Sequence, residues 1–214
     1  MSAFLIPPQT TLRNPKSNFK MTDWDQCYRE GNTPWNKDRP SPALAQYLEQ
    51  HPLAGRVFVP GCGLGHDVAL LAKQGAQPVG LDLSPLAVEK ARAAHPELPP
   101  ETFVLGDLYA LPAEYIGTFD AMVEHTCLSA MPPELRPSYR DAVASVLKPG
   151  GLIVGVYYIN PDLDPGETGP PYPLPVAELD AMFAEGFEVI EDYVPDVGYD
   201  GRVGRELLRV LRKR

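Results

Sequence analysis

The chain has few cysteines, no long apolar run and fewer basic than acidic residues. Its three cysteines, Cys27, Cys62 and Cys127, show no paired spacing, so the sequence predicts neither a disulfide framework nor a metal cluster. No apolar stretch approaches the roughly 20 residues of a membrane span, and the N-terminus lacks the apolar core of a secretion signal. We therefore expect a cytoplasmic protein that binds neither a metal nor a membrane.

The shortage of positive charge excludes a further class of partner. The sequence has 19 Lys and Arg against 28 Asp and Glu, a formal net charge of −9 and a pI near 4.9. A phosphate backbone requires a basic surface, so we expect no nucleic-acid partner and favour a small-molecule substrate. Basic residues do cluster near the C-terminus, where we expect a solvated edge strand and tail rather than an anion site. They are Arg202, Arg205, Arg209, Arg212, Lys213 and Arg214.

A glycine-rich turn is the most informative feature that is present. Residues 57–60 read as an apolar strand, which runs directly into a turn containing Gly61, Gly63 and Gly65. Glycines let the backbone approach a ligand that a Cβ would exclude. The next predicted strand is followed by Asp82, near the spacing of about 20 residues at which an acid reaches a ribose hydroxyl. The pattern predicts a nucleoside-cofactor site, with a simple tight turn as the alternative.

Asp67 narrows the choice of cofactor. It lies in the first turn of the helix that follows the glycines, where a dinucleotide cofactor would place its pyrophosphate. A carboxylate there repels a pyrophosphate but suits an amino group or a sulfonium. In addition, His66 occupies the position of the third glycine of a dinucleotide loop. The residues therefore favour S-adenosylmethionine over NAD.

The rest of the chain reads as alternating strands and helices in one domain. At 214 residues it is long enough for a single α/β core, and the short apolar strands indicate a parallel sheet buried on both faces. We expect an N-terminal arm and lid over residues 1–50, of which the first twenty are loose, and a domain over residues 51–214. Predicted strands cover 57–60, 78–81, 102–105, 119–124, 152–158, 187–194 and 205–211. Predicted helices cover 42–50, 66–74, 85–94, 134–147 and 176–184, and 160–175 is expected to be an ordered loop over the site.

Four motifs in order give the chain a family resemblance. With residues 60–67, 80–84, 106–108 and 147–151, it resembles the class I S-adenosylmethionine-dependent methyltransferases. The aromatic segment 24–35 is similar to the N-terminal signature of the thiopurine S-methyltransferase family, which includes halide and thiol methyltransferases. This resemblance implies a single Rossmann-like, doubly wound sheet of seven strands. The sheet is mostly parallel with the last strand antiparallel, and helices cover both faces.

The resemblance also implies a set of cofactor-binding residues. The three glycines would line the methionine part of S-adenosylmethionine, Asp82 would accept the ribose hydroxyls, and Asp107 would hold the adenine. The remaining residues of the set are Trp24, Tyr28 and Trp35, which would close over the cofactor, together with Asp67, Leu83, Leu108 and Glu124. Several assignments have a plainer alternative: Asp107 as a turn residue or helix cap, the two tryptophans as core residues under a docked arm, and Glu124 as a partner of His125 at a strand end.

Methyl transfer from a sulfonium needs neither a metal nor a covalent intermediate, because the enzyme mainly aligns the reactants. We expect a small soft acceptor, such as a thiol, sulfide or halide, and S-adenosylhomocysteine as the product. His125 is the candidate proton acceptor, because its pKa is near neutrality, and Tyr28 is the second catalytic candidate, at the border of the acceptor pocket. The alternatives are a small-molecule O- or N-methyltransferase and a non-catalytic cofactor-binding protein. We expect a monomer, with a dimer as the alternative.

Overall fold

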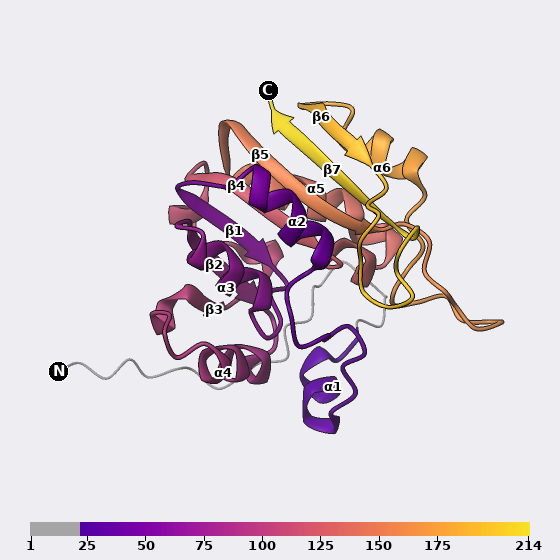
Figure 1. Ribbon diagram of the computed structural model, residues 1–214, viewed down its shortest axis with the longest axis horizontal. Helices are drawn as coiled ribbons and strands as arrows, with labels where there is room; N and C mark the ends of the chain where they lie inside the picture. Colours follow the sequence, from indigo (N-terminus) through magenta and orange to yellow (C-terminus); the bar gives the residue numbers. More distant parts are fainter. Residues whose placement is uncertain (1–21) are drawn as a thin grey trace.

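The computed structural model describes residues 22–214, so the loose arm predicted for the first twenty residues lies outside the described part of the chain. Its centre is one seven-stranded sheet in the order β3-β2-β1-β4-β5-β7-β6 (Figure 1). The strands from β1 to β5 pair in parallel, and β7 is antiparallel to both β5 and β6. The prediction of a mostly parallel sheet with an antiparallel last strand is confirmed. The strands are β1 (Arg56–Pro60), β2 (Gln77–Asp82), β3 (Phe103–Leu105), β4 (Phe119–His125), β5 (Leu147–Tyr158), β6 (Phe187–Tyr193) and β7 (Glu206–Lys213).

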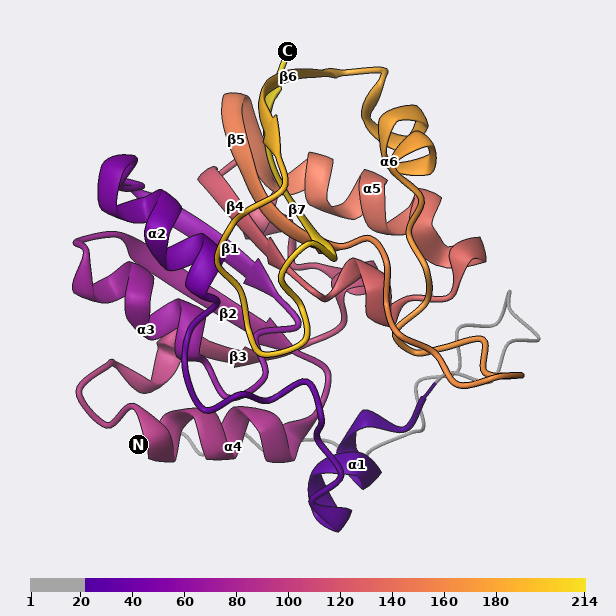
Figure 2. The same ribbon diagram turned by 45° about the vertical axis from the view of Figure 1, so that its right-hand side comes forward.

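Helices cover both faces of this sheet, as predicted (Figure 2). Residues of α2, α3 and α4 share one apolar core with the sheet, and residues of α5 and α6 share the other. Along β1 the side chains alternate between the two cores: Val57 and Val59 face the first and Phe58 faces the second. The helices are α1 (Trp24–Glu30), α2 (Pro42–Gln50), α3 (His66–Lys73), α4 (Pro85–Ala94), α5 (Arg136–Val146) and α6 (Val176–Phe183).

Two predicted helix starts are confirmed by their caps. The side chain of Ser41 accepts a hydrogen bond from Leu44 N (3.3 Å), and the side chain of Ser84 accepts one from Ala87 N (3.1 Å). A proline follows each serine at the first helical position, where its missing N–H costs nothing. The cap of α4 matters for the site, because it fixes the backbone directly after Asp82.

The helix predicted over 134–147 is shorter than expected. A 3₁₀ turn covers Pro133–Leu135, so α5 begins at Arg136. At the other end of α5, Leu147 pairs with Phe119 of β4. Strand β5 therefore begins before Pro149, Gly150 and Gly151 and not after them.

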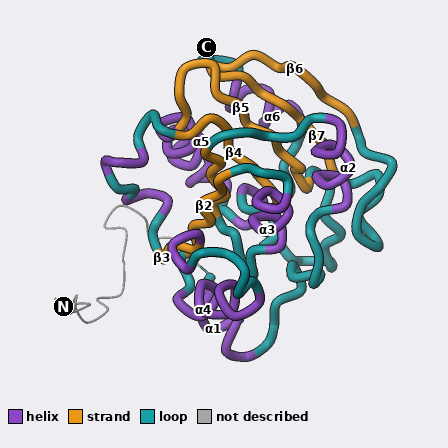
Figure 3. The backbone as a smooth tube through the Cα atoms, turned by 60° about the vertical axis from the view of Figure 1, so that its left-hand side comes forward, coloured by secondary structure: helices purple, strands orange, loops and turns teal. Residues whose placement is uncertain are grey.

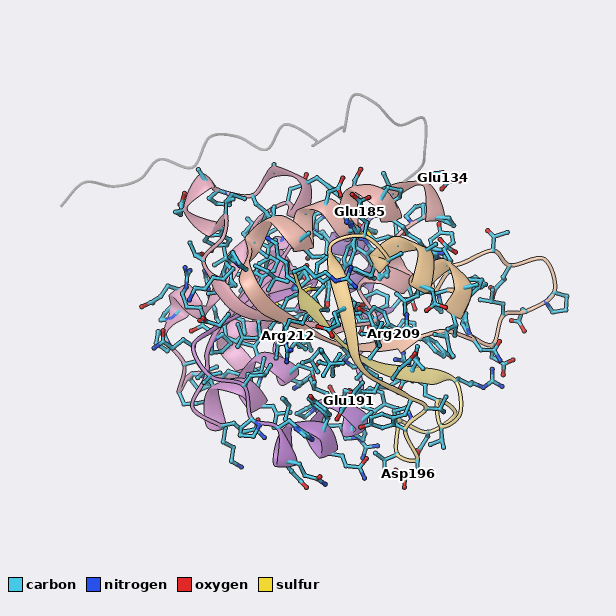
Figure 4. The ribbon with its side chains drawn as sticks, turned by 90° about the horizontal axis from the view of Figure 1, so that it is seen from above. Glu134, Glu185, Glu191, Asp196, Arg209 and Arg212 are labelled. Carbon is cyan, nitrogen blue, oxygen red and sulfur yellow. The ribbon has the colours of Figure 1, made fainter. Side chains whose placement is uncertain are left out.

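The interpretation of the C-terminal arginines as a solvated edge strand is wrong. The edge strand is β6, whereas β7 lies between β5 and β6. Figure 4 labels two arginines of β7, of which Arg212 is exposed and Arg209 is buried. Arg209 is held by two carboxylates, Asp180 of α6 (2.7 Å) and Asp192 of β6 (2.6 Å). This ion triad lets a charged residue occupy an inner strand.

The two longest connections contain neither helix nor strand (Figure 3). Residues 159–175 join β5 to α6, and residues 194–205 join β6 to β7. The first connection is anchored, because Tyr172 N donates to Ser129 O (2.6 Å) and Arg136 donates to Pro173 O (2.9 Å). These contacts hold the end of the segment that leads into α6, and the expectation that the segment covers the site stays a prediction.

Candidate functional site

The carboxyl ends of β1, β2 and β4 meet at one edge of the sheet, and the glycine turn lies there. Gly63 has φ 53° and Gly65 has φ 79°, conformations that disfavour a side chain. A Cβ at Gly65 would also clash with Cε1 of Phe103, and one at Gly63 would lie 3.0 Å from the Tyr28 hydroxyl. The turn therefore needs glycine both for its backbone shape and for close packing.

Asp82 is held beside this turn by backbone donors. Its Oδ2 accepts a hydrogen bond from Gly63 N (2.8 Å), and its Oδ1 accepts one from Ser84 N (2.9 Å). Burial raises the pKa of this carboxyl, and these backbone N–H groups oppose the rise. Each carboxylate oxygen has a further lone pair. Two neighbouring hydroxyls, such as those of a ribose, can therefore bind to an acceptor already fixed in orientation.

The residues predicted to hold adenine lie after β3. Asp107 accepts a hydrogen bond from Tyr109 N (2.8 Å) and so caps a 3₁₀ turn over Leu108–Ala110. The helix-cap interpretation is thus correct, although a cap uses one lone pair and leaves others for a ligand. Leu108 is buried, while Leu83 exposes 42% of its surface beside Asp82. The exposed apolar side chain of Leu83 offers a surface against which an adenine ring can pack. The adenine contact stays a prediction.

The three aromatic residues of the N-terminal segment form one cluster. The rings of Trp24 and Trp35 meet edge-on at 5.2 Å, and Tyr28 meets Trp35 at 5.8 Å. The Trp35 indole donates to the Tyr28 hydroxyl (3.2 Å), which lies next to Gly63. Both tryptophans are half-buried, and their contact with the cofactor stays a prediction. Burial raises the pKa of Tyr28, which makes it a poor base and leaves it a hydrogen-bonding and packing role.

Two of these aromatic residues, Trp24 and Tyr28, belong to α1, a helix that the sequence analysis missed, and Trp35 lies after its end. Asp23 caps its start by accepting from Gln26 N (2.9 Å), and Gly31 ends it in the left-handed region. The helix is attached to α4, because Asp25 accepts from Ser84 Oγ (2.7 Å) and from Leu86 N (3.1 Å). Asp25 thus links the aromatic cluster to the residues that fix Asp82.

Replacing Asp25 by Ala removes two of the three hydrogen bonds that attach α1 to α4 and leaves the one that Lys90 donates to Tyr28 O (3.2 Å). Hydrogen bonds to a carboxylate contribute about 1.5 to 3 kcal/mol when buried, and less at this partly exposed position. We expect cofactor affinity, measured by calorimetry, to fall roughly five- to thirtyfold, with little change in the KM of the acceptor. Glu30→Ala on the same helix is the control, because Glu30 is exposed and bonds to Gln26. Equal affinities for the two variants would contradict a role of Asp25 in the cofactor site.

The first turn of α3 and the end of β4 are joined by a largely buried, hydrogen-bonded pair of side chains. Asp67 accepts a hydrogen bond from His125 Nδ1 (2.7 Å) with one oxygen and from Ser41 N (2.9 Å) with the other. Burial raises the pKa of Asp67, but the His125 and Ser41 interactions outweigh it, so the pKa is lowered and the carboxylate is ionised. Because both oxygens have protein partners, the predicted contact of Asp67 with the cofactor stays a prediction.

His125 is oriented by this pair and keeps one nitrogen available. Since Asp67 only accepts, Nδ1 carries the proton, and in the neutral ring Nε2 holds the lone pair. Nε2 is buried and has no hydrogen-bond partner among residues 22–214. Burial lowers the pKa of His125, but the carboxylates of Asp67 and Glu206 outweigh it and leave the pKa raised. The charged and titratable groups that influence His125 are Asp67, Glu206, Arg202, Glu124 and Tyr199.

Glu124 faces the opposite side of the sheet from His125, because neighbouring residues of a strand alternate. It accepts hydrogen bonds from Leu128 N (2.9 Å) and from the Tyr139 hydroxyl of α5. The alternative that Glu124 and His125 form a pair is therefore wrong. Glu124 instead holds the turn after β4, in which Thr126 has φ 62°, a conformation that is costly for a β-branched residue. Its contact with the methionine moiety stays a prediction.

The surroundings of His125 include residues that the sequence analysis did not assign to the site. The ring of Tyr199 stacks on His125 with centroids 5.7 Å apart, and its hydroxyl donates to Arg39 O (2.7 Å). Arg202 and Glu206 form an ion pair beside them (3.3 Å). Tyr199 and Arg202 belong to the connection from β6 to β7, far along the chain from β4, and no local motif indicated that they reach it.

Two further observations concern the whole described chain. No helix within residues 22–214 is both long enough and apolar enough to cross a membrane. In the same residues, no group of three or more His, Cys, Asp or Glu side chains is arranged to hold a metal ion.

Comparison with known proteins extends these observations. The sheet order, the glycine turn and Asp82 at the carboxyl edge are those of a Rossmann-like S-adenosylmethionine-dependent methyltransferase. The chain belongs to the thiopurine S-methyltransferase family, whose model matches residues 19–203. It is accordingly an S-adenosylmethionine-dependent methyltransferase, and the cofactor prediction is confirmed.

Relatives of known function and solved structures agree with this membership. Thiocyanate methyltransferase 1 of Brassica oleracea is 31% identical over 98% of this chain and 92% of its own length. Thiopurine S-methyltransferase of Xanthomonas campestris pv. campestris is 31% identical over 78% and 84%. Burkholderia thailandensis 1,6-didemethyltoxoflavin-N1-methyltransferase, solved with bound S-adenosylhomocysteine, is 21% identical with a TM-score of 0.67 over 89% of this chain and 85% of its own. At that identity the last comparison supports the fold alone.

Proposed function

We propose that this enzyme transfers the methyl group of S-adenosylmethionine to the sulfur of a small thiol or related sulfur nucleophile. The names of its relatives, which include thiocyanate, thiol and thiopurine methyltransferases, support a sulfur acceptor. The observation that carries the proposal is the buried Nε2 of His125, which has no partner among residues 22–214 and lies at the end of β4 beside the glycine turn. A thiol supplies the proton that this nitrogen can take.

The residues at the edge of the sheet fit the cofactor. Asp82 is fixed in orientation for the ribose hydroxyls, and the glycine turn admits a ligand to the backbone. The aromatic cluster of Trp24, Tyr28 and Trp35 would pack against the methionine part, where aromatic faces favour a positive sulfur. When bound, the cofactor supplies an electrophilic methyl group on a sulfonium.

His125 would act as the proton acceptor for the incoming thiol. Nε2 would take the S–H proton, and the acceptor sulfur would bond to the methyl carbon as the bond from that carbon to the sulfonium sulfur breaks. The protonated ring would then release the proton to solvent. Nδ1 donates to Asp67 throughout, which holds the ring and stabilises the imidazolium that forms. An ordinary thiol has a pKa of about 8.5. The raised pKa of His125 therefore reduces the difference between the pKa values of the base and of the thiol.

The pKa of His125 predicts opposite pH profiles for two kinds of acceptor. Below its pKa the ring is protonated and cannot take a thiol proton, so kcat/KM for a thiol rises with pH through a value above the ordinary one of about 6.5. An acceptor without a proton, such as thiocyanate, gains from the protonated ring, and its kcat/KM falls over the same range. Asp67→Asn removes a carboxylate that raises the pKa of His125, so the rise for the thiol and the fall for thiocyanate both move to lower pH. Parallel profiles for the two acceptors would contradict the proposed role of His125.

The acceptor class itself is tested by supplying purified enzyme and cofactor with thiols, alcohols and amines of the same carbon skeleton. We expect transfer to thiols, and transfer only to alcohols or amines would replace this proposal with O- or N-methylation. The net charge of −9 supports a small molecule and not a nucleic acid as the acceptor. We further propose that the enzyme is a cytoplasmic monomer, which light scattering tests for the oligomeric state.

A further inference from the structure

A second buried polar atom without a partner lies in the group of residues around His125. Glu206 begins β7 and is 2% exposed. Its Oε1 accepts a hydrogen bond from Arg202 (3.3 Å), whereas its Oε2 has no donor among residues 22–214. Buried carboxylate oxygens normally have partners, because an unsatisfied one loses its hydration without compensation. Oε2 is therefore in a position to accept a hydrogen bond from a ligand.

Arg202 balances the charge of Glu206 without occupying this oxygen. Its guanidinium lies over the ring of Tyr158 (4.5 Å) and near the ring of Tyr199 (5.5 Å). A guanidinium held between two aromatic faces and one carboxylate oxygen has a fixed orientation. On the side of the sheet that His125 faces, the charged groups beside it are then two carboxylates, Asp67 and Glu206, against one permanent cation, Arg202.

Glu206 and His125 belong to the same site. The ring of Tyr199 stacks on His125 and lies beside Arg202, and the carboxylate of Glu206 is near enough to His125 to raise its pKa. The two side chains come from the carboxyl end of β4 and the start of β7, which meet at the end of β5. One atom, His125 Nε2, suits an S–H proton, and the other, Glu206 Oε2, suits a second donor on the same small molecule.

We propose that Glu206 recognises an amino or hydroxyl group close to the sulfur of the acceptor. The acceptors would then be small aminothiols and hydroxythiols, with a cationic amino group bound best and a carboxylate disfavoured. This inference rests on the proposed function, since it places the acceptor thiol at His125. It goes further by naming the chemical group that accompanies the sulfur.

Four small thiols test the proposal: cysteamine, mercaptoethanol, mercaptoacetate and ethanethiol. We expect kcat/KM of the wild-type enzyme for cysteamine to exceed that for mercaptoacetate by at least about tenfold, which one favourable charge interaction supplies. In Glu206→Gln this ratio should fall about five- to tenfold relative to the wild-type enzyme, because the carboxylate is lost. The four thiols differ in acidity, and this difference cancels when the ratio in the variant is compared with the ratio in the wild-type enzyme.

Glu188→Gln is the matched control, because it removes the same charge from an exposed position on the edge strand. It should keep the wild-type ratio, and an equal loss in this variant would assign the selectivity to the overall negative charge. If Glu206→Gln folds poorly, the wild-type enzyme still tests the proposal. A ratio near one between kcat/KM for cysteamine and for mercaptoacetate would overturn it. Turnover of ethanethiol separates the two claims. If ethanethiol is methylated without selectivity among the others, the subsite is wrong, and if no thiol is methylated, the proposed function is wrong.

Discussion

Replacing His125 by Asn is expected to lower kcat/KM for a thiol about 100-fold near neutral pH, within the range of about 10² to 10⁴ for loss of a general base. The amide of Asn can still donate to Asp67, so the variant removes Nε2 while keeping the interaction with α3. The loss should shrink to less than about tenfold well above the thiol pKa of about 8.5, because the solvent then supplies the thiolate.

This dependence on pH distinguishes a chemical role of His125 from a structural one. A histidine that only supports the fold would lower activity by the same factor at every pH. His51→Asn is the control, because His51 is an exposed residue at the end of α2 that stacks on Tyr47. Steady-state rates across the pH range measure how the loss depends on pH, and melting temperatures show whether the variants stay folded. A loss independent of pH, or no loss, would remove His125 from the mechanism.

Replacing Asp82 by Ala is expected to weaken S-adenosylmethionine binding by about 1.5 to 3 kcal/mol, which corresponds to roughly 10- to 150-fold. The carboxylate would no longer accept the ribose hydroxyls, and Gly63 N and Ser84 N would lose their acceptor. Calorimetry should show the same factor for S-adenosylhomocysteine, because the two ligands share the ribose.

Asp82→Asn separates ligand recognition from support of the turn. It keeps the shape of the side chain and one oxygen that can accept from the backbone, so the protein should stay folded while affinity for both ligands still falls. Circular dichroism checks the fold. Unchanged affinity in a folded variant would place the ribose elsewhere, and a loss for S-adenosylmethionine alone would assign Asp82 to the sulfonium and not to the ribose.

The sequence was sufficient to predict the architecture because its signals are local. Serine followed by proline marks the starts of α2 and α4, and short apolar strands ending at glycines or Asp82 mark the parallel sheet. The glycine turn and Asp82 were found in the same way, since close approach of a ligand leaves a trace in residue type. The helix α1 was missed although Asp23 and Gly31 carried its cap signals, because its aromatic residues Trp24 and Tyr28 suggested only a lid.

The rest of the site depends on contacts between distant segments. Alternating arginines and apolar residues near the C-terminus resemble an exposed strand until Asp180 and Asp192 are seen to neutralise Arg209. Tyr199 and Glu206 approach His125 only because β7 is inserted beside β5. No propensity or motif encodes such an insertion, and the buried atoms without partners were visible only in the structure.

The most direct test of the central claim uses mercaptoethanol as the acceptor, because one molecule offers both a sulfur and an oxygen. Purified enzyme is mixed with S-adenosylmethionine carrying a labelled methyl group, and the product is identified by mass spectrometry and NMR. We expect the labelled methyl on sulfur, in a product that His125→Asn forms much more slowly near neutral pH. A labelled methyl on oxygen, or bound cofactor without transfer to any thiol tried, would contradict the claim.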